Sequence, residues 1–118
     1  MRPTSKAGIT AGPRRLPRTR RRLERTRAAL ERAQATEREL VEQVAHLDAV
    51  AADAHTRGLV AEDPQAARDA RDARSDLDRH TAQLDDTRRE IRRLLAEQDA
   101  LLERLLELTR QPGRRNPT

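Results

Sequence analysis

Apolar residues recur at alternating intervals of three and four along two stretches of this chain, residues 18–57 and 65–110, and neither stretch contains Gly or Pro. A helix that packs along another helix places apolar residues at positions a and d of a seven-residue repeat, a to g. The a and d positions of the first stretch are Leu23, Thr26, Leu30, Ala33, Glu37, Leu40, Val44, Leu47, Ala51 and Ala54. Those of the second stretch are Ala66, Ala70, Ala73, Leu77, His80, Leu84, Thr87, Ile91, Leu94, Gln98, Leu101, Leu105 and Leu108. The pattern predicts two long helices that lie against each other.

Pro and Gly residues mark the expected ends of these helices. Pro17 fits the first turn of a helix, where its missing N–H costs nothing, and Gly58 suits a left-handed residue just past a helix end. Asp63 is a good N-cap, and Pro64 fits the first position of the helix that follows it. The predicted organisation is a disordered basic arm over residues 1–16, a helical hairpin over 17–110 (helix 17–57, turn 58–63, helix 64–110) and a disordered tail over 111–118.

The short link between the two helices favours an antiparallel arrangement. With the fold point near Ala61, residue n of one helix faces residue 122 − n of the other. Glu37, a polar core position, then reaches Arg88 or Arg89. The predicted fold class is all-α, a long antiparallel two-helix coiled-coil hairpin with disordered basic termini.

Composition agrees with a coiled coil and excludes several other classes. The 118 residues include no aromatic residue and are 38% charged, so a compact core built on aromatic area is not expected. The chain has no Cys, which excludes disulfides and Cys-ligated zinc. No apolar run approaches the length of a membrane span and no signal-like apolar segment follows the basic start, so we expect a cytoplasmic protein without membrane contact.

The second helix carries more leucine near its end than one partner helix can cover. The leucines of this self-association or partner face are Leu94, Leu95, Leu101, Leu102, Leu105, Leu106 and Leu108. Leu95, Leu102 and Leu106 form a stripe beside the core positions, and a two-helix hairpin alone is only marginally stable. We therefore predict a homodimer, a four-helix assembly joined through this stripe, or docking of a partner helix.

Charge is distributed unevenly along the chain. The formal net charge is +5, but residues 1–22 carry +8 and no acidic group, whereas residues 23–109 carry −6. Dense guanidinium groups bind phosphates by charge and by paired hydrogen bonds. The candidate nucleic-acid-binding residues are Arg14, Arg15, Arg18, Arg20, Arg21, Arg22, Arg25 and Arg27. A basic segment before heptads is similar to the layout of basic leucine zippers, but this segment has no Asn to read bases and Pro17 interrupts it, so we assign no family.

Nothing in the sequence indicates a catalytic, metal or cofactor site. The three histidines, His46, His55 and His80, do not share a helix face at the spacing of metal ligands. There is no Gly-rich phosphate loop, and no carboxylate lies in an apolar segment that would raise its pKa for acid–base catalysis. We therefore expect no enzyme, no cofactor and no small-molecule substrate. The expected function is a non-enzymatic coiled-coil scaffold or interaction protein, and the alternative is a nucleic-acid-binding accessory protein that uses its arginine-rich arm without reading sequence.

Overall fold

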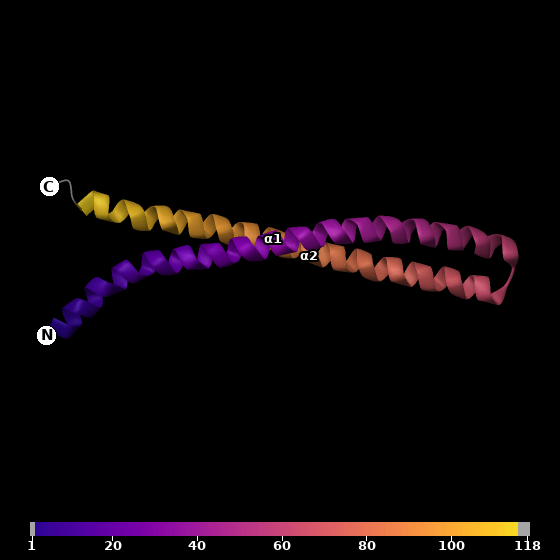
Figure 1. Cartoon of the computed structure of the whole chain (residues 1–118), viewed down its shortest axis with the longest axis horizontal. Helices are drawn as coiled ribbons and strands as arrows, with labels where there is room; N and C mark the ends of the chain where they lie inside the picture. The colour runs from indigo at the N-terminus through magenta and orange to yellow at the C-terminus, as the bar shows by residue number, and fades with distance from the viewer. Residues whose placement is uncertain (1, 116–118) are drawn as a thin grey trace. The chain divides into compact units, whose positions relative to one another are not determined.

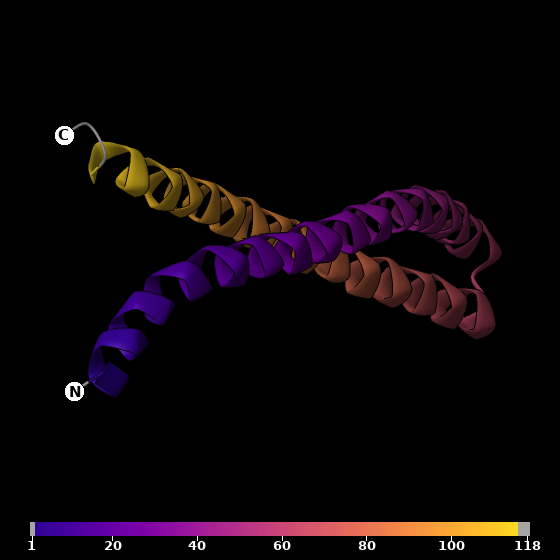
Figure 2. The same cartoon turned by 60° about the vertical axis from the view of Figure 1, so that its left-hand side comes forward.

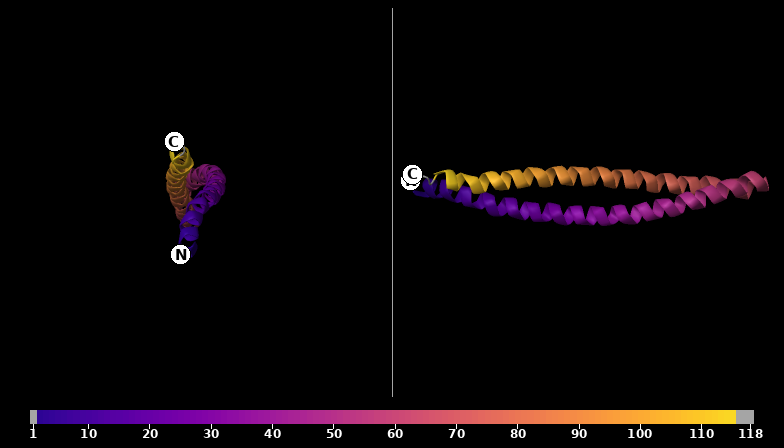
Figure 3. Two further views of the ribbon diagram at one scale, coloured as in Figure 1. Left: turned by 90° about the vertical axis from the view of Figure 1, so that its left-hand side faces the viewer. Right: turned by 90° about the horizontal axis from the view of Figure 1, so that it is seen from above.

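Two long helices account for nearly all of the computed structural model, which describes the backbone of residues 2–115 and the side chains of residues 14–110. Helix α1 spans Arg2–Ala61 and helix α2 spans Pro64–Arg115, and these described residues contain no strand (Figure 1). The helices pack along each other and run in opposite directions (Figure 3, right). The predicted all-α antiparallel hairpin is therefore confirmed.

The chain divides into two units, and each contains a segment of both helices. The first unit consists of residues up to Glu31 together with those from Arg92 onward, and the second comprises Arg32–Ile91, including the turn. The buried residues of the first unit are Thr19, Leu23, Thr26, Leu30, Leu94 and Leu101. Those of the second unit are Leu40, Ala51, Ala54, Leu77, Leu84 and Ile91. Each unit thus has a narrow core that both helices share.

The heptad register predicted from the sequence is confirmed within each unit. Every a and d position named above is buried or half-buried, and the same spacing continues outward to Thr19 and Leu16. In the second unit, Nε of Arg88 lies 3.0 Å from Oε2 of Glu37, as predicted. The residue numbers of this pair add up to 125, close to the expected 122, so the predicted alignment of the two helices is correct to within one helical turn.

The turn is shorter than predicted, and the role expected for Gly58 belongs to another residue. Helix α1 continues through Gly58 to Ala61, and the left-handed backbone conformation occurs at Glu62, with a φ of 50°. The start of α2 agrees with the prediction, because the backbone N–H of Gln65 donates to Oδ1 of Asp63 at 3.2 Å. The prediction of a turn over residues 58–63 was wrong because an αL glycine and a glycine inside a helix look alike in sequence.

Gly58 instead lies where α2 approaches α1 closely. A Cβ atom built at Gly58 would lie 3.6 Å from the carbonyl oxygen of Ala66 and 3.8 Å from Cβ of Ala70. Buried Ala51 and Ala54 precede it on the same face of α1. Small side chains on both helices therefore allow the close packing next to the turn.

The outer ends of both helices also differ from the prediction. Helix α1 begins at Arg2 rather than at Pro17, and α2 continues to Arg115 rather than ending at Arg110, so helical backbone occupies most of the predicted arm and tail. A proline inside a helix removes one N–H donor and bends the axis, which need not end the helix. The hydroxyl of Thr19 donates to the carbonyl oxygen of Arg15 at 2.7 Å beside Pro17, and α1 curves in its first turns (Figure 2). Residues 116–118 of the predicted tail lie outside the described residues.

Candidate functional site

Five arginines from both helices line a groove in the first unit. Arg15, Arg18, Arg22 and Arg25 come from α1, and Arg104 comes from α2. Thr19 and Leu101 complete the lining of this space of about 360 Å³. We call this feature the arginine groove. The four residues on α1 are spaced by three, four and three positions, which places them along one face of the helix.

No acidic residue lines the arginine groove. Within the part of the chain that the structure describes, none of its five guanidinium groups forms an ion pair with a carboxylate. An adjacent groove contains three acidic side chains, because Glu97, Glu103 and Glu107 lie there beside Arg22 and Arg104. The arginine groove is therefore a local concentration of positive charge.

A hydrogen bond between the helices holds one of these neighbouring carboxylates in place. The hydroxyl of buried Thr26 donates to Oε2 of Glu97 at 2.7 Å. On α2 itself, Nη1 of Arg93 lies 3.4 Å from Oε1 of the same carboxylate. Both oxygens of Glu97 thus have partners, and neither partner belongs to the arginine groove.

The structure separates the predicted nucleic-acid-binding residues into two groups. It brings Arg15, Arg18, Arg22 and Arg25 together in the groove. Arg14, Arg20, Arg21 and Arg27 are exposed and do not line it. Sequence reasoning missed Arg104, although the alignment of n with 122 − n places that residue opposite Arg18. The sequence therefore contained the information that places Arg104 in the groove, in the predicted alignment of the two helices rather than in the local run of arginines.

The seven leucines of the predicted association face also fall into separate groups. Leu94 and Leu101 are buried, with 3% and 7% of their surface exposed, and Leu105 and Leu108 are half-buried at core positions. Leu95 and Leu106 remain 40% and 60% exposed, and Leu102 between them is half-buried. Leu95, Leu102 and Leu106 lie beside the core positions, and we call them the leucine stripe.

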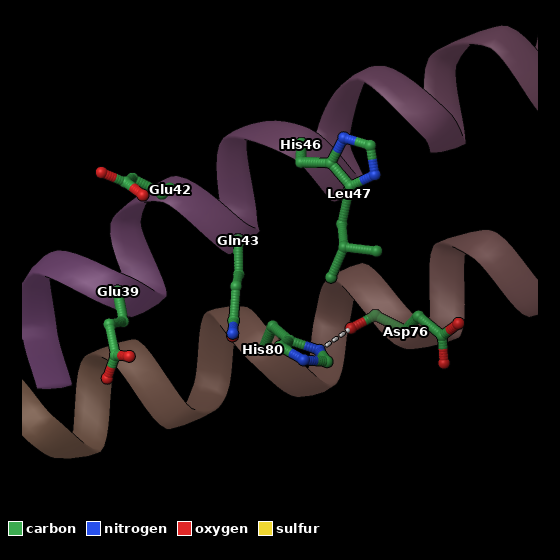
Figure 4. Close-up of a pocket in the computed structure, with 7 residues that line it drawn as sticks. All are labelled: Glu39, Glu42, Gln43, His46, Leu47, Asp76 and His80. Atoms are coloured by element: carbon green, nitrogen blue, oxygen red, sulfur yellow. Dashed lines mark hydrogen bonds between the residues drawn. The ribbon is translucent and has the colours of Figure 1, made fainter.

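A second groove, in the second unit, is lined by two of the three histidines and by three carboxylates. It has a volume of about 570 Å³ and is lined by Glu39, Glu42, Gln43, His46, Leu47, Asp76 and His80. Figure 4 shows that its carboxylates point away from the two imidazole rings. Nδ1 of His80 lies 2.8 Å from the backbone carbonyl oxygen of Asp76, which accepts its hydrogen. This geometry does not assemble an acid–base pair.

Metal-ligand clusters and membrane-spanning helices are both absent from the described residues. Among them, no group of three or more His, Cys, Asp or Glu side chains has the geometry to hold a metal ion. No described helix has a stretch long and apolar enough to cross a membrane.

Comparison of the chain with protein-family models, with curated proteins and with solved structures finds no match. Its function must therefore be inferred from the surfaces described above.

Proposed function

We propose that this chain is a non-enzymatic coiled-coil interaction protein that associates with a second copy of itself through the leucine stripe. The observation that supports this proposal is the exposure of Leu95 and Leu106 after α1 has packed against α2. Isolated exposed apolar residues are ordinary, but two exposed leucines with half-buried Leu102 between them on one helix face are typical of a helix that has a further partner.

The positions of the three leucines suit a symmetric partner. In the heptad register of α2, Leu95 and Leu102 occupy e positions and Leu106 a b position, so all three flank the core on the same side. Two copies that pair antiparallel about a point near Leu102 bring Leu95 of one copy close to Leu106 of the other. The result is a four-helix assembly in which each copy contributes one hairpin.

The exposed leucine surface sets the expected strength of association. The exposed fractions of Leu95 and Leu106, 40% and 60%, together correspond to one fully exposed leucine per chain. Burying a leucine contributes about 1.5–3 kcal/mol, so two copies gain roughly 3–6 kcal/mol from these residues. A Kd of 1 mM corresponds to about 4.1 kcal/mol and one of 1 µM to about 8.2 kcal/mol. The middle of the range of roughly 3–6 kcal/mol, about 4.5 kcal/mol, predicts a weak dimer with a Kd of roughly 500 µM.

Sedimentation equilibrium of the full chain over about 10 µM to 1 mM tests the proposal, because this range brackets the expected Kd. The mean mass should rise from that of a 13.4 kDa monomer toward twice that value. Leu106→Gln should keep the chain monomeric. Leu59→Gln removes a leucine that is 70% exposed outside the stripe and serves as the matched control, which should leave the dimer unchanged. A monomeric mass throughout this range would overturn the proposal.

A further inference from the structure

The arginine groove contains five positive charges that lack ionic partners among the described residues. Its α1 residues run from Arg15 to Arg25, which is about 15 Å of helix at 1.5 Å per residue. Arg104 adds a guanidinium group from α2 on the facing side. Like charges gathered in this way repel one another, and an anion that spans the groove relieves that repulsion.

We propose that the arginine groove binds a run of consecutive phosphate groups, as carried by a nucleic-acid backbone. Guanidinium groups match phosphate oxygens in charge and in paired hydrogen-bond geometry. A run about 15 Å long accommodates several successive phosphates, whereas a single small anion would leave most of the arginines unpaired. The ligand is therefore a chain of phosphates rather than one isolated ion.

The side chains between the arginines indicate that the groove reads charge and not base sequence. The hydroxyl of Thr19 is already bonded to the backbone of its own helix, and Leu101 offers no polar group. The chain contains no aromatic residue on which a base could stack. Contacts to phosphates position a nucleic acid without specifying its sequence.

The arginine groove and the leucine stripe lie on opposite sides of the first unit's core. Arg15, Arg22 and Arg104 occupy g positions, whereas Leu95 and Leu102 occupy e positions, and e and g flank a helical core on opposite sides. Self-association through the stripe therefore leaves the groove accessible. Phosphate binding does not depend on dimerisation, and each property can fail without the other.

The experiment is binding of the full chain to a mixed-sequence DNA duplex, measured by fluorescence anisotropy at about 50, 100 and 200 mM salt. If each of five arginines neutralises one phosphate, log K falls with log salt at a slope of about −4.5. Affinity should then decrease roughly 500-fold between 50 and 200 mM. Absence of binding at the lowest salt would overturn the proposal.

Single substitutions locate the site. Arg104→Gln should weaken binding about tenfold at the lowest salt and make the slope less steep by about one unit. Arg104→Lys keeps the charge and should retain most of the affinity. Arg92→Gln is the matched control, because Arg92 is an exposed arginine of the same helix that does not line the groove. If Arg104→Gln and Arg92→Gln reduce the affinity for DNA equally, binding depends on the total charge of the chain. That result would overturn the proposal that the arginine groove is the binding site.

Inorganic polyphosphate distinguishes the sources of the phosphate chain. Polyphosphate carries consecutive phosphates without sugars or bases, so it should displace the duplex from the groove. The Arg104→Gln variant should bind polyphosphate more weakly than the unsubstituted chain does. If polyphosphate displaces DNA at equal phosphate concentration, the phosphate chain alone is the recognised group. If it displaces DNA only in large excess, the backbone of the nucleic acid is the preferred ligand. Displacement that Arg104→Gln does not affect would contradict the proposal.

Discussion

Replacing Gly58 by Ala is expected to stabilise the protein. Gly58 lies inside α1 without a positive φ, and in a helix Gly is about 0.8–1.0 kcal/mol less favourable than Ala. The new Cβ would meet the carbonyl oxygen of Ala66 at 3.6 Å and Cβ of Ala70 at 3.8 Å. Both are ordinary van der Waals distances, so the added methyl group introduces no strain.

We therefore expect Gly58→Ala to increase the free energy of unfolding by about 1 kcal/mol and to raise the midpoint of thermal unfolding by roughly 3–5 °C. Far-UV circular dichroism, recorded during heating and urea titration at one fixed protein concentration, measures both quantities. Glu62→Gly is a useful comparison. This substitution removes about 1 kcal/mol of left-handed strain from the folded state. It also raises the conformational entropy of the unfolded chain, which lowers stability by a similar amount, so the net change in the free energy of unfolding should be small.

The opposite result would refute this assignment. If Gly58 were the left-handed residue that ends α1, Gly58→Ala would lower the free energy of unfolding by about 1–2 kcal/mol. A lower midpoint for Gly58→Ala, together with a clear loss of stability for Glu62→Gly, would mean that Gly58 is the left-handed residue and that the helix ends at residue 57 after all.

Five further substitutions, grouped in three experiments, test the packing of α1 against α2. Thr26→Val keeps the volume of a buried side chain but removes its hydrogen bond between the helices, and urea unfolding should show a loss of about 1 kcal/mol. A double-mutant cycle with Glu37→Gln and Arg88→Gln should give a coupling of less than about 1 kcal/mol that decreases with added salt, whereas a coupling independent of salt would contradict a solvent-exposed ion pair. Leu94→Ala should lower the free energy of unfolding of the monomer by about 2–4 kcal/mol, and Leu95→Ala should lower it by less than about 1 kcal/mol. Similar decreases for both would show that the burial of these two leucines is wrongly assigned.

The helix-packing pattern was the most predictable part of this fold. Leu23, Leu30 and Leu40 recur at heptad spacing because only that face of α1 meets α2, and they are all buried. The same periodicity, combined with a short link between the helices, is sufficient to pair Glu37 with Arg88. Long helices of residues with high helix propensity leave few alternatives to this arrangement.

The helix ends were less predictable because local signals there have more than one physical meaning. Gly58 can end a helix by adopting a left-handed conformation, or it can let two helices approach, and the neighbouring helix decides between these roles. Pro17 can begin a helix or bend one. Neither choice can be read from the residues immediately around these two positions.

The arginine groove was only half predictable for a similar reason. Arg15, Arg18 and Arg22 stand out as a local cluster in the sequence, whereas Arg104 joins them only through the packing of α2 against α1. The exposed arginines that the groove excludes belong to the same local run. Composition therefore indicates a basic segment, and the antiparallel pairing selects which of its members act together.

The measurement that tests the antiparallel hairpin most directly is disulfide formation between cysteines introduced at positions 58 and 70. The chain has no cysteine of its own, and the Cβ positions of Gly58 and Ala70 lie 3.8 Å apart, within the range of disulfides. The pair Gly58→Cys and Ala70→Cys should oxidise within one chain, as shown by non-reducing electrophoresis and intact mass. A matched pair at positions 58 and 72 should not, because Asp72 is exposed and lies on the face of α2 opposite Ala70. If the 58–70 pair fails to form an intramolecular disulfide, or forms only disulfides between chains, α2 does not fold back on α1 as described.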